Sequence, residues 1–139
     1  MKTNELMIGD IVNIKCLNIE DEEVFLPGKI VTVGEDFVSA IAIDDTYQFE
    51  CPEIFEGVPL TAEILEKNGF KKHDDCFVYK GQNLDIVIDM YEDENIILSI
   101  SHTHQGRYDN IHVLIRYVHE IQHALRLFGL GDIADNFKI

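Results

Sequence analysis

Residues 84–90 read Leu-Asp-Ile-Val-Ile-Asp-Met, with an apolar side chain at every second position and Asp85 and Asp89 between them. Successive side chains of a β-strand point to opposite faces, so this stretch predicts a strand with one buried and one solvated face. The polar residues 92–95, Glu-Asp-Glu-Asn, predict a hairpin turn. Because every second residue of 96–100 is again apolar, a second antiparallel strand is expected to continue the same buried face.

A short helix and a further strand are expected before this hairpin. Thr61 is typical of a helix N-cap, and Gly69 is typical of a helix end, so residues between them are predicted to be helical. Residues 76–79 form an apolar run that ends at Lys80-Gly81, which predicts a short strand.

The longest helix is expected to follow the hairpin. Asp109 or Asn110 is the predicted cap, and Gly129 is the predicted end. Its apolar stripe has helical spacing and consists of Ile111, Leu114, Ile115, Val118, Ile121, Leu125 and Phe128. Residues 58–139 are therefore expected to form an α+β unit of one helix, three antiparallel strands and one helix.

Residues 1–57 contain short β-rich runs separated by turn residues, and they show no helical pattern. Gly9-Asp10 precedes the first run, and Pro27-Gly28 is expected to turn the chain into the run 29–33. Several short strands in so few residues resemble a small SH3-like β-barrel of the Tudor or KOW type. The expected fold class is therefore α+β, and the barrel and the unit 58–139 form either two domains or one compact domain.

The composition indicates a folded, acidic protein. Of 139 residues, 46% are hydrophobic, and 26 acidic against 11 basic residues give a formal net charge of -15. This charge repels phosphate backbones and anionic membrane surfaces, so neither nucleic acid nor membrane is an expected direct partner. Three distant cysteines, an N-terminal sequence unlike a signal peptide, and no apolar run near the roughly 20 residues of a membrane span lead us to expect a cytoplasmic location.

One short motif points to zinc chemistry. Residues 119–123 read His-Glu-Ile-Gln-His, the His-Glu-x-x-His signature of the zinc metallopeptidases called zincins. On a helix, His119 and His123 share a face and can bind one zinc ion, while Glu120 can act as general base on the zinc-bound water. A third ligand is required; Asp132 and Asp135 are the acidic candidates after His123, and Asp132 is the one we select. The alternative is structural: both histidines then belong to an amphipathic stripe at the border of the core.

A second group of histidines could also bind a metal. His102 and His104 are expected on one face of a strand, and His112 follows after a short loop. Three neutral imidazoles suit a transition metal such as zinc, copper or nickel. The alternative is that these residues are solvated side chains at the end of a strand.

Three stretches together resemble a known group of proteins. They are residues 4–10, Asn-Glu-Leu-Met-Ile-Gly-Asp; residues 58–70, Val-Pro-Leu-Thr-Ala-Glu-Ile-Leu-Glu-Lys-Asn-Gly-Phe; and residues 117–125, Tyr-Val-His-Glu-Ile-Gln-His-Ala-Leu. In this order they resemble a family of small uncharacterised proteins of gut Bacteroidetes, their phages and mobile elements. No activity is assigned to that family, so the resemblance implies no catalytic or cofactor residue. Relatives of this type often have His-Gln-Leu-Gln-Asn at positions 119–123, which argues against zinc chemistry.

The function expected from the sequence is that of a non-enzymatic, cytoplasmic interaction module without a cofactor, of a phage or mobile-element type. Its partner would be another protein or a second copy of the chain. One alternative is a zinc metallohydrolase with Glu120 as the catalytic residue and His119, His123 and Asp132 as ligands. Another is an acidic decoy of a nucleic-acid-binding protein, in which residues 20–23 imitate phosphate charge.

Overall fold

The computed structural model describes residues 5–35, 37–45, 48–50, 55–82, 84–91, 95–104 and 107–139. The chain forms two compact units, and each unit combines segments that are distant in the sequence. Unit 1 consists of Met1–Pro59 and Tyr117–Asp135, and unit 2 consists of Leu60–Arg116 and Asn136–Ile139. The sequence predicts one boundary near residue 58, whereas the chain enters unit 2 at Leu60 and returns to unit 1 at Tyr117.

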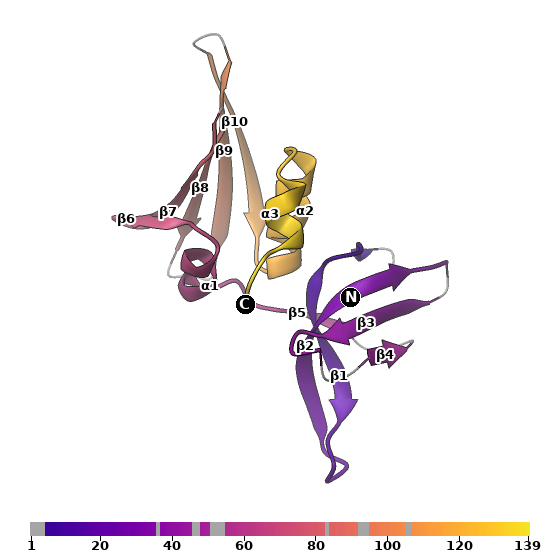
Figure 1. The fold of residues 1–139 in the computed structure, drawn as a ribbon. Helices are drawn as coiled ribbons and strands as arrows, with labels where there is room; N and C mark the ends of the chain where they lie inside the picture. Colours follow the sequence, from indigo (N-terminus) through magenta and orange to yellow (C-terminus); the bar gives the residue numbers. More distant parts are fainter. Residues whose placement is uncertain are drawn as a thin grey trace. The chain divides into compact units, whose positions relative to one another are not determined.

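Unit 1 contains an antiparallel sheet with the strand order β4-β3-β2-β1-β5. Its strands are β1 (Ile11–Leu17), β2 (Glu23–Val33), β3 (Val38–Ala42), β4 (Gln48–Glu50) and β5 (Phe55–Gly57). The hairpin of β1 and β2 is the longest projection of this sheet (Figure 1). Among the described residues no strand pair joins the edge strands β4 and β5, so the sheet is open and the expected SH3-like barrel is not confirmed.

The core of this sheet comes from side chains that alternate along its strands. A buried cluster comprises Leu6, Val12, Ile14, Ile30, Val38, Ala40 and Phe55. The turn predicted at Pro27-Gly28 is wrong, because β2 runs through both residues and Gly28 lies opposite Val12. A Cβ atom on Gly28 would overlap the side chain of Ile14. The glycine therefore permits close packing in mid-strand instead of a change of direction.

Two helices complete unit 1: α2 (Val118–Leu127) and α3 (Gly131–Asp135). Val118, Ile121 and Leu125 of α2 are buried, as the predicted apolar stripe requires. Gly129 adopts a φ of 77° just after α2, in the left-handed region that favours glycine, and confirms the predicted helix end. No helix in the described part of the chain is both long and apolar enough to span a membrane.

Unit 2 contains a second antiparallel sheet, with the order β10-β9-β8-β7-β6, and one short helix. Its elements are α1 (Ala62–Lys67), β6 (Lys71–His73), β7 (Cys76–Lys80), β8 (Leu84–Met90), β9 (Ile96–His104) and β10 (Arg107–Ile115). The predicted cap is confirmed, since the hydroxyl of Thr61 accepts a hydrogen bond from the amide of Ile64. The predicted buried face is confirmed at Leu84, Ile86, Ile88, Ile96, Leu98 and Ile100.

The helix predicted from Asp109 or Asn110 is wrong over its first part. Residues 107–115 form β10, which pairs with β9 residue by residue, including Ile111 with Ile100. Apolar residues at 111, 114, 115 and 118 fit helical spacing, but pairing with β9 satisfies the backbone of this segment instead. The second sheet has five strands and not three. Two antiparallel sheets with a few short helices make the protein α+β, as predicted.

Candidate functional site

The two histidines of the His-Glu-x-x-His motif lie one turn apart on α2, as predicted. The centroids of the His119 and His123 rings are 5.8 Å apart, and the ring planes meet at 76°. His119 is buried, whereas His123 is half-buried. Whether this pair can act as a zinc site depends on what the other side chains of the motif do.

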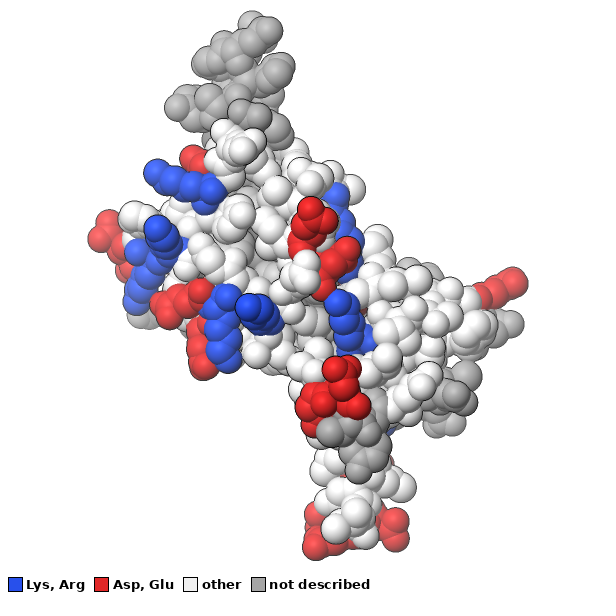
Figure 2. Space-filling model, in the orientation of Figure 1, with Lys and Arg blue, Asp and Glu red and all other residues white. Residues whose placement is uncertain are grey.

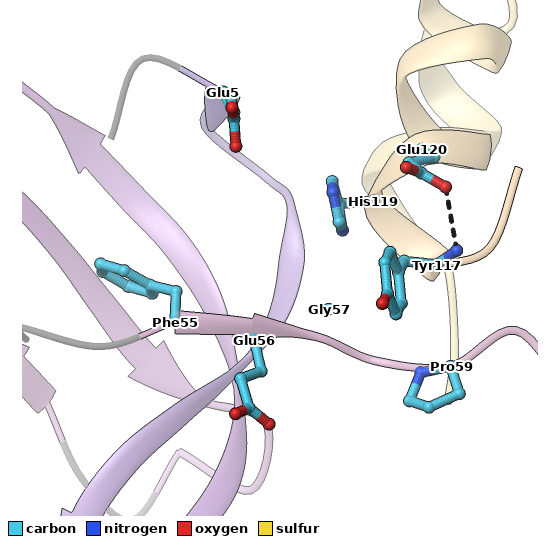
Figure 3. A pocket seen from close by; sticks show the side chains of 8 residues that line it. All are labelled: Glu5, Phe55, Glu56, Gly57, Pro59, Tyr117, His119 and Glu120. Atoms are coloured by element: carbon cyan, nitrogen blue, oxygen red, sulfur yellow. Dashed lines mark hydrogen bonds between the residues drawn. The ribbon is translucent and has the colours of Figure 1, made fainter. Parts of the chain in front are cut away.

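Glu120 caps the helix on which it lies. Its Oε2 atom accepts a hydrogen bond from the backbone amide of Tyr117 at 3.1 Å (Figure 3). This contact satisfies one of the amides that a helix start leaves without an intrahelical partner. The structure thus gives Glu120 a structural role, and its role as a general base stays a prediction.

His123 is bound to a buried carboxylate. Its Nε2 atom lies 2.7 Å from Oδ2 of Asp10, a residue that is fully buried. The same carboxylate accepts hydrogen bonds from Nη1 of Arg126 at 2.6 Å and from the amide of Met7 at 2.7 Å. A buried carboxylate is stable only with such partners. Asp10, His123, Arg126 and the amide of Met7 therefore form a structural network that connects the start of β1 to α2.

Asp132, the expected third zinc ligand, does not form a metal-binding group with His119 and His123 in the described residues. Asp132 is an exposed residue of α3, and Asp135 of the same helix pairs with Arg126 of α2. Within the described ranges, no three His, Cys, Asp or Glu side chains form a group that could hold a metal ion. The zinc set of His119, His123 and Asp132 therefore stays a prediction.

The second histidine group is only partly described. His112 lies on β10 opposite Ser99, and its Nδ1 atom is 2.8 Å from the Ser99 hydroxyl. His102 and His104 lie at the far end of β9, and their side chains fall outside what the structure describes. A metal site formed by these three histidines stays a prediction.

Gln122 is a structural residue that the sequence reasoning missed. It is fully buried, and its Oε1 atom accepts a hydrogen bond from the amide of Ile11 at 2.9 Å. Its Nε2 atom donates to the carbonyls of Gly9 at 2.9 Å and Ala134 at 2.8 Å. One side chain thus joins α2 to β1 and to α3. The only sequence signal is a glutamine beside the apolar stripe of a helix, which does not identify its partners.

A pocket of about 620 Å³ lies at the start of α2, within unit 1 (Figure 3). Its lining comes from three segments of the chain and consists of Glu5, Phe55, Glu56, Gly57, Pro59, Tyr117, His119 and Glu120. A Cβ atom on Gly57 would overlap the ring of Tyr117, so a glycine is required at this wall. The volume is within the range of small-ligand pockets, and three of the eight lining residues carry carboxylates.

His119, which lines this pocket, is a buried histidine. The residue is only 6% exposed, and its Nδ1 atom has no hydrogen-bond partner among the described residues. Its ring stacks on that of Tyr117, with the centroids 5.8 Å apart and the planes 10° from parallel. Burial lowers the pKa of His119 from its ordinary value, although Glu120, Asp10 and Glu5 oppose this shift. Burial therefore favours the neutral form of the His119 ring.

The negative charge of the protein is concentrated in the unit that carries this pocket. Unit 1 has 16 acidic and 4 basic residues, a formal charge of -12, whereas unit 2 has 10 acidic and 7 basic residues, a charge of -3. Figure 2 shows acidic side chains gathered at the tip of the β1–β2 hairpin. The pocket thus lies in a field that attracts cations.

Comparison with known proteins finds no matching family model, no similar curated protein and no similar solved structure. The resemblance to proteins of gut Bacteroidetes and their mobile elements therefore stays a prediction from the sequence. The function is therefore argued below from the chemistry of the chain's own residues.

Proposed function

We propose that the protein is a non-enzymatic, cytoplasmic interaction module that binds a positively charged segment of a partner protein at the pocket of unit 1. The observation that carries this proposal is the pocket lining, which includes the three carboxylate residues Glu5, Glu56 and Glu120. Hydrogen-bond acceptors and carboxylates in one pocket suit a cationic hydrogen-bond donor.

The charge of unit 1 supports a basic partner. A formal charge of -12 on one small unit raises the local concentration of cations and accelerates the association of a basic protein. It disfavours DNA, RNA and anionic lipid for the same reason. A second copy carries the same net charge of -15, so repulsion between copies favours a different protein as the partner.

The side chains that zinc hydrolysis would need have structural roles instead. Glu120 caps α2. Nε2 of His123 contacts the buried carboxylate of Asp10. Both contacts stabilise the helix that carries the pocket. This supports a binding role for the segment 117–123 more than a catalytic one.

The test uses a disordered peptide of alternating glycine and basic residues, with lysine and arginine in equal number. We expect binding by calorimetry at about 0.1 M salt and a marked loss at about 1 M, where the Debye length falls from about 10 Å to about 3 Å. Glu56→Gln, in the pocket, should weaken binding more than Glu35→Gln, which removes the same charge from an exposed position of unit 1 outside the pocket. Absence of binding at low salt, or equal effects of the two substitutions, would overturn the proposal.

A further inference from the structure

The edge strands of the two sheets differ in how well they are protected. An edge strand presents unpaired backbone N–H and C=O groups, which a strand of another chain can bind, and proteins limit this with short edge strands and exposed lysines. β4, β5 and β6 have three residues each, and β6 (Lys71–His73) contains two exposed lysines. β10, the opposite edge of the second sheet, has nine residues.

β10 also lacks the other protections against pairing. It pairs with β9 in one unbroken register (Figure 1), so no bulge turns the edge away, and it contains no proline. Among the described strands, β9 is its only neighbour. Residues 111–114 are all exposed, and the apolar ones, Ile111, Val113 and Leu114, are 39% to 52% exposed. A long, regular and apolar edge of this kind can accept a further strand.

The charge at this edge favours a second copy of the chain over a basic partner. Residues 96–115, which span β9 and β10, contain one arginine and one aspartate, a formal charge of 0 in a chain of -15. Residues 111–114 contain no carboxylate that a basic segment could bind. Unit 2 carries -3 and unit 1 carries -12. The repulsion that disfavours a second copy at the pocket of unit 1 is therefore smallest at β10.

Two copies of β10 can pair with their apolar residues opposite one another. In an antiparallel pair whose twofold axis passes at His112, Ile111 of each copy lies opposite Val113 of the other. Both side chains lie on the sheet face that carries the buried residues Ile100 and Leu98, because these are their partners on β9. We propose that a second copy of this chain pairs antiparallel with β10 and joins the two sheets into one. This inference goes beyond the proposed function, since it concerns a different unit and a different partner.

The first experiment follows self-association of the unmodified chain by sedimentation equilibrium. A single strand pair is a small interface, so we expect monomer at about 10 µM and dimer at about 0.5 mM. Because like charges repel, the dimer fraction should rise between about 0.05 M and about 0.5 M salt. Salt should instead weaken binding of the basic peptide to unit 1, so the two proposals can fail separately. A chain that stays monomeric at high salt, or a dimer that salt dissociates, would overturn the pairing.

Hydrogen exchange locates the contact without a substitution. Amides of β10 should exchange more slowly at the higher protein concentration, because pairing protects them. β6, the other edge of the same sheet, is the internal control and should not change. A dimer that leaves β10 unprotected would show that another surface is used and would overturn the proposal.

A pair of variants separates the edge from the general effect of charge. Ile111→Lys places a charge in the paired edge and should raise the midpoint concentration of dimerisation at least about tenfold, or about 1.4 kcal/mol. Tyr91→Lys adds the same charge outside the strands of unit 2, at a residue of similar exposure. An added lysine lowers the repulsion between chains of charge -15, so Tyr91→Lys should not weaken the dimer. Equal midpoints in the two variants would contradict the role given to β10.

Discussion

The guanidinium of Arg126 and the carboxylate of Asp10 form a 2.6 Å ion pair between residues that are 116 positions apart in the sequence. Asp10 is fully buried, and its second oxygen contacts Nε2 of His123 on the same helix. The pair therefore joins the start of β1 to α2. Because His119 lies at the other end of α2, this network also helps to position the pocket.

Replacing the buried carboxylate should destabilise the protein strongly. Asp10→Asn leaves the largely buried guanidinium of Arg126 without its closest counter-charge, and we expect a loss of about 3 kcal/mol in the free energy of unfolding. Urea unfolding measures this loss. Asp135→Asn is the matched control, because Asp135 also pairs with Arg126 but its side chain is 59% exposed. It should cost less than about 1 kcal/mol, and equal losses in the two variants would contradict the importance given to burial.

Gln122 should be as sensitive to substitution as a core residue. Gln122→Met keeps a side chain of similar length but leaves the amide of Ile11 and the carbonyls of Gly9 and Ala134 without their partner. We expect a loss of about 3 kcal/mol, measured by urea unfolding. Leu127→Gln, at a position of α2 that is 83% exposed, should change stability by less than about 0.5 kcal/mol. A tolerated Gln122→Met would show that water replaces the three contacts.

The stability of the protein should fall as the solution is acidified below the ordinary histidine pKa of 6.5. Burial lowers the pKa of His119 in the folded state, so between the folded pKa and 6.5 the unfolded chain binds a proton that the folded chain does not. Unfolding therefore becomes more favourable as pH falls. Glu120, Asp10 and Glu5 oppose the shift, and His123 adds to it.

Urea midpoints at about pH 7.5 and about pH 5.5 test this dependence. In His119→Phe the difference between the two midpoints should be smaller than in the unsubstituted chain, because the titrating ring is absent. An unchanged difference would show that His119 does not cause the loss.

Zinc should not bind with structural affinity. With Glu120 and His123 engaged, we expect untagged protein to contain well under one zinc per chain after dialysis, by elemental analysis. Added zinc should leave the melting temperature unchanged, since a ligand that binds the folded state would raise it. One zinc per chain that is lost in His123→Ala would instead favour the hydrolase.

Local patterns predicted much of the secondary structure. Alternation in residues 84–90 and 96–100 identified two strands, and Thr61 and Gly129 identified a helix start and a helix end. The prediction failed at residues 109–115, whose apolar positions suit both a helix and an edge strand. Pairing with β9 makes this segment a strand and not a helix. The spacing of apolar residues within one segment does not show which other segment it pairs with.

The sequence by itself determined the strands 84–90 and 96–100, the start of α1 at Thr61, and how strongly negative the protein is. These properties depend on the residues at neighbouring positions or on their total number. Only the tertiary structure decided that Asp10 meets Arg126, that Gln122 binds Gly9, and that Glu56 and His119 line one pocket. Each of these pairs joins residues more than 60 positions apart, and the burial of Asp10 and Gln122 removes water from polar atoms that would otherwise be solvated.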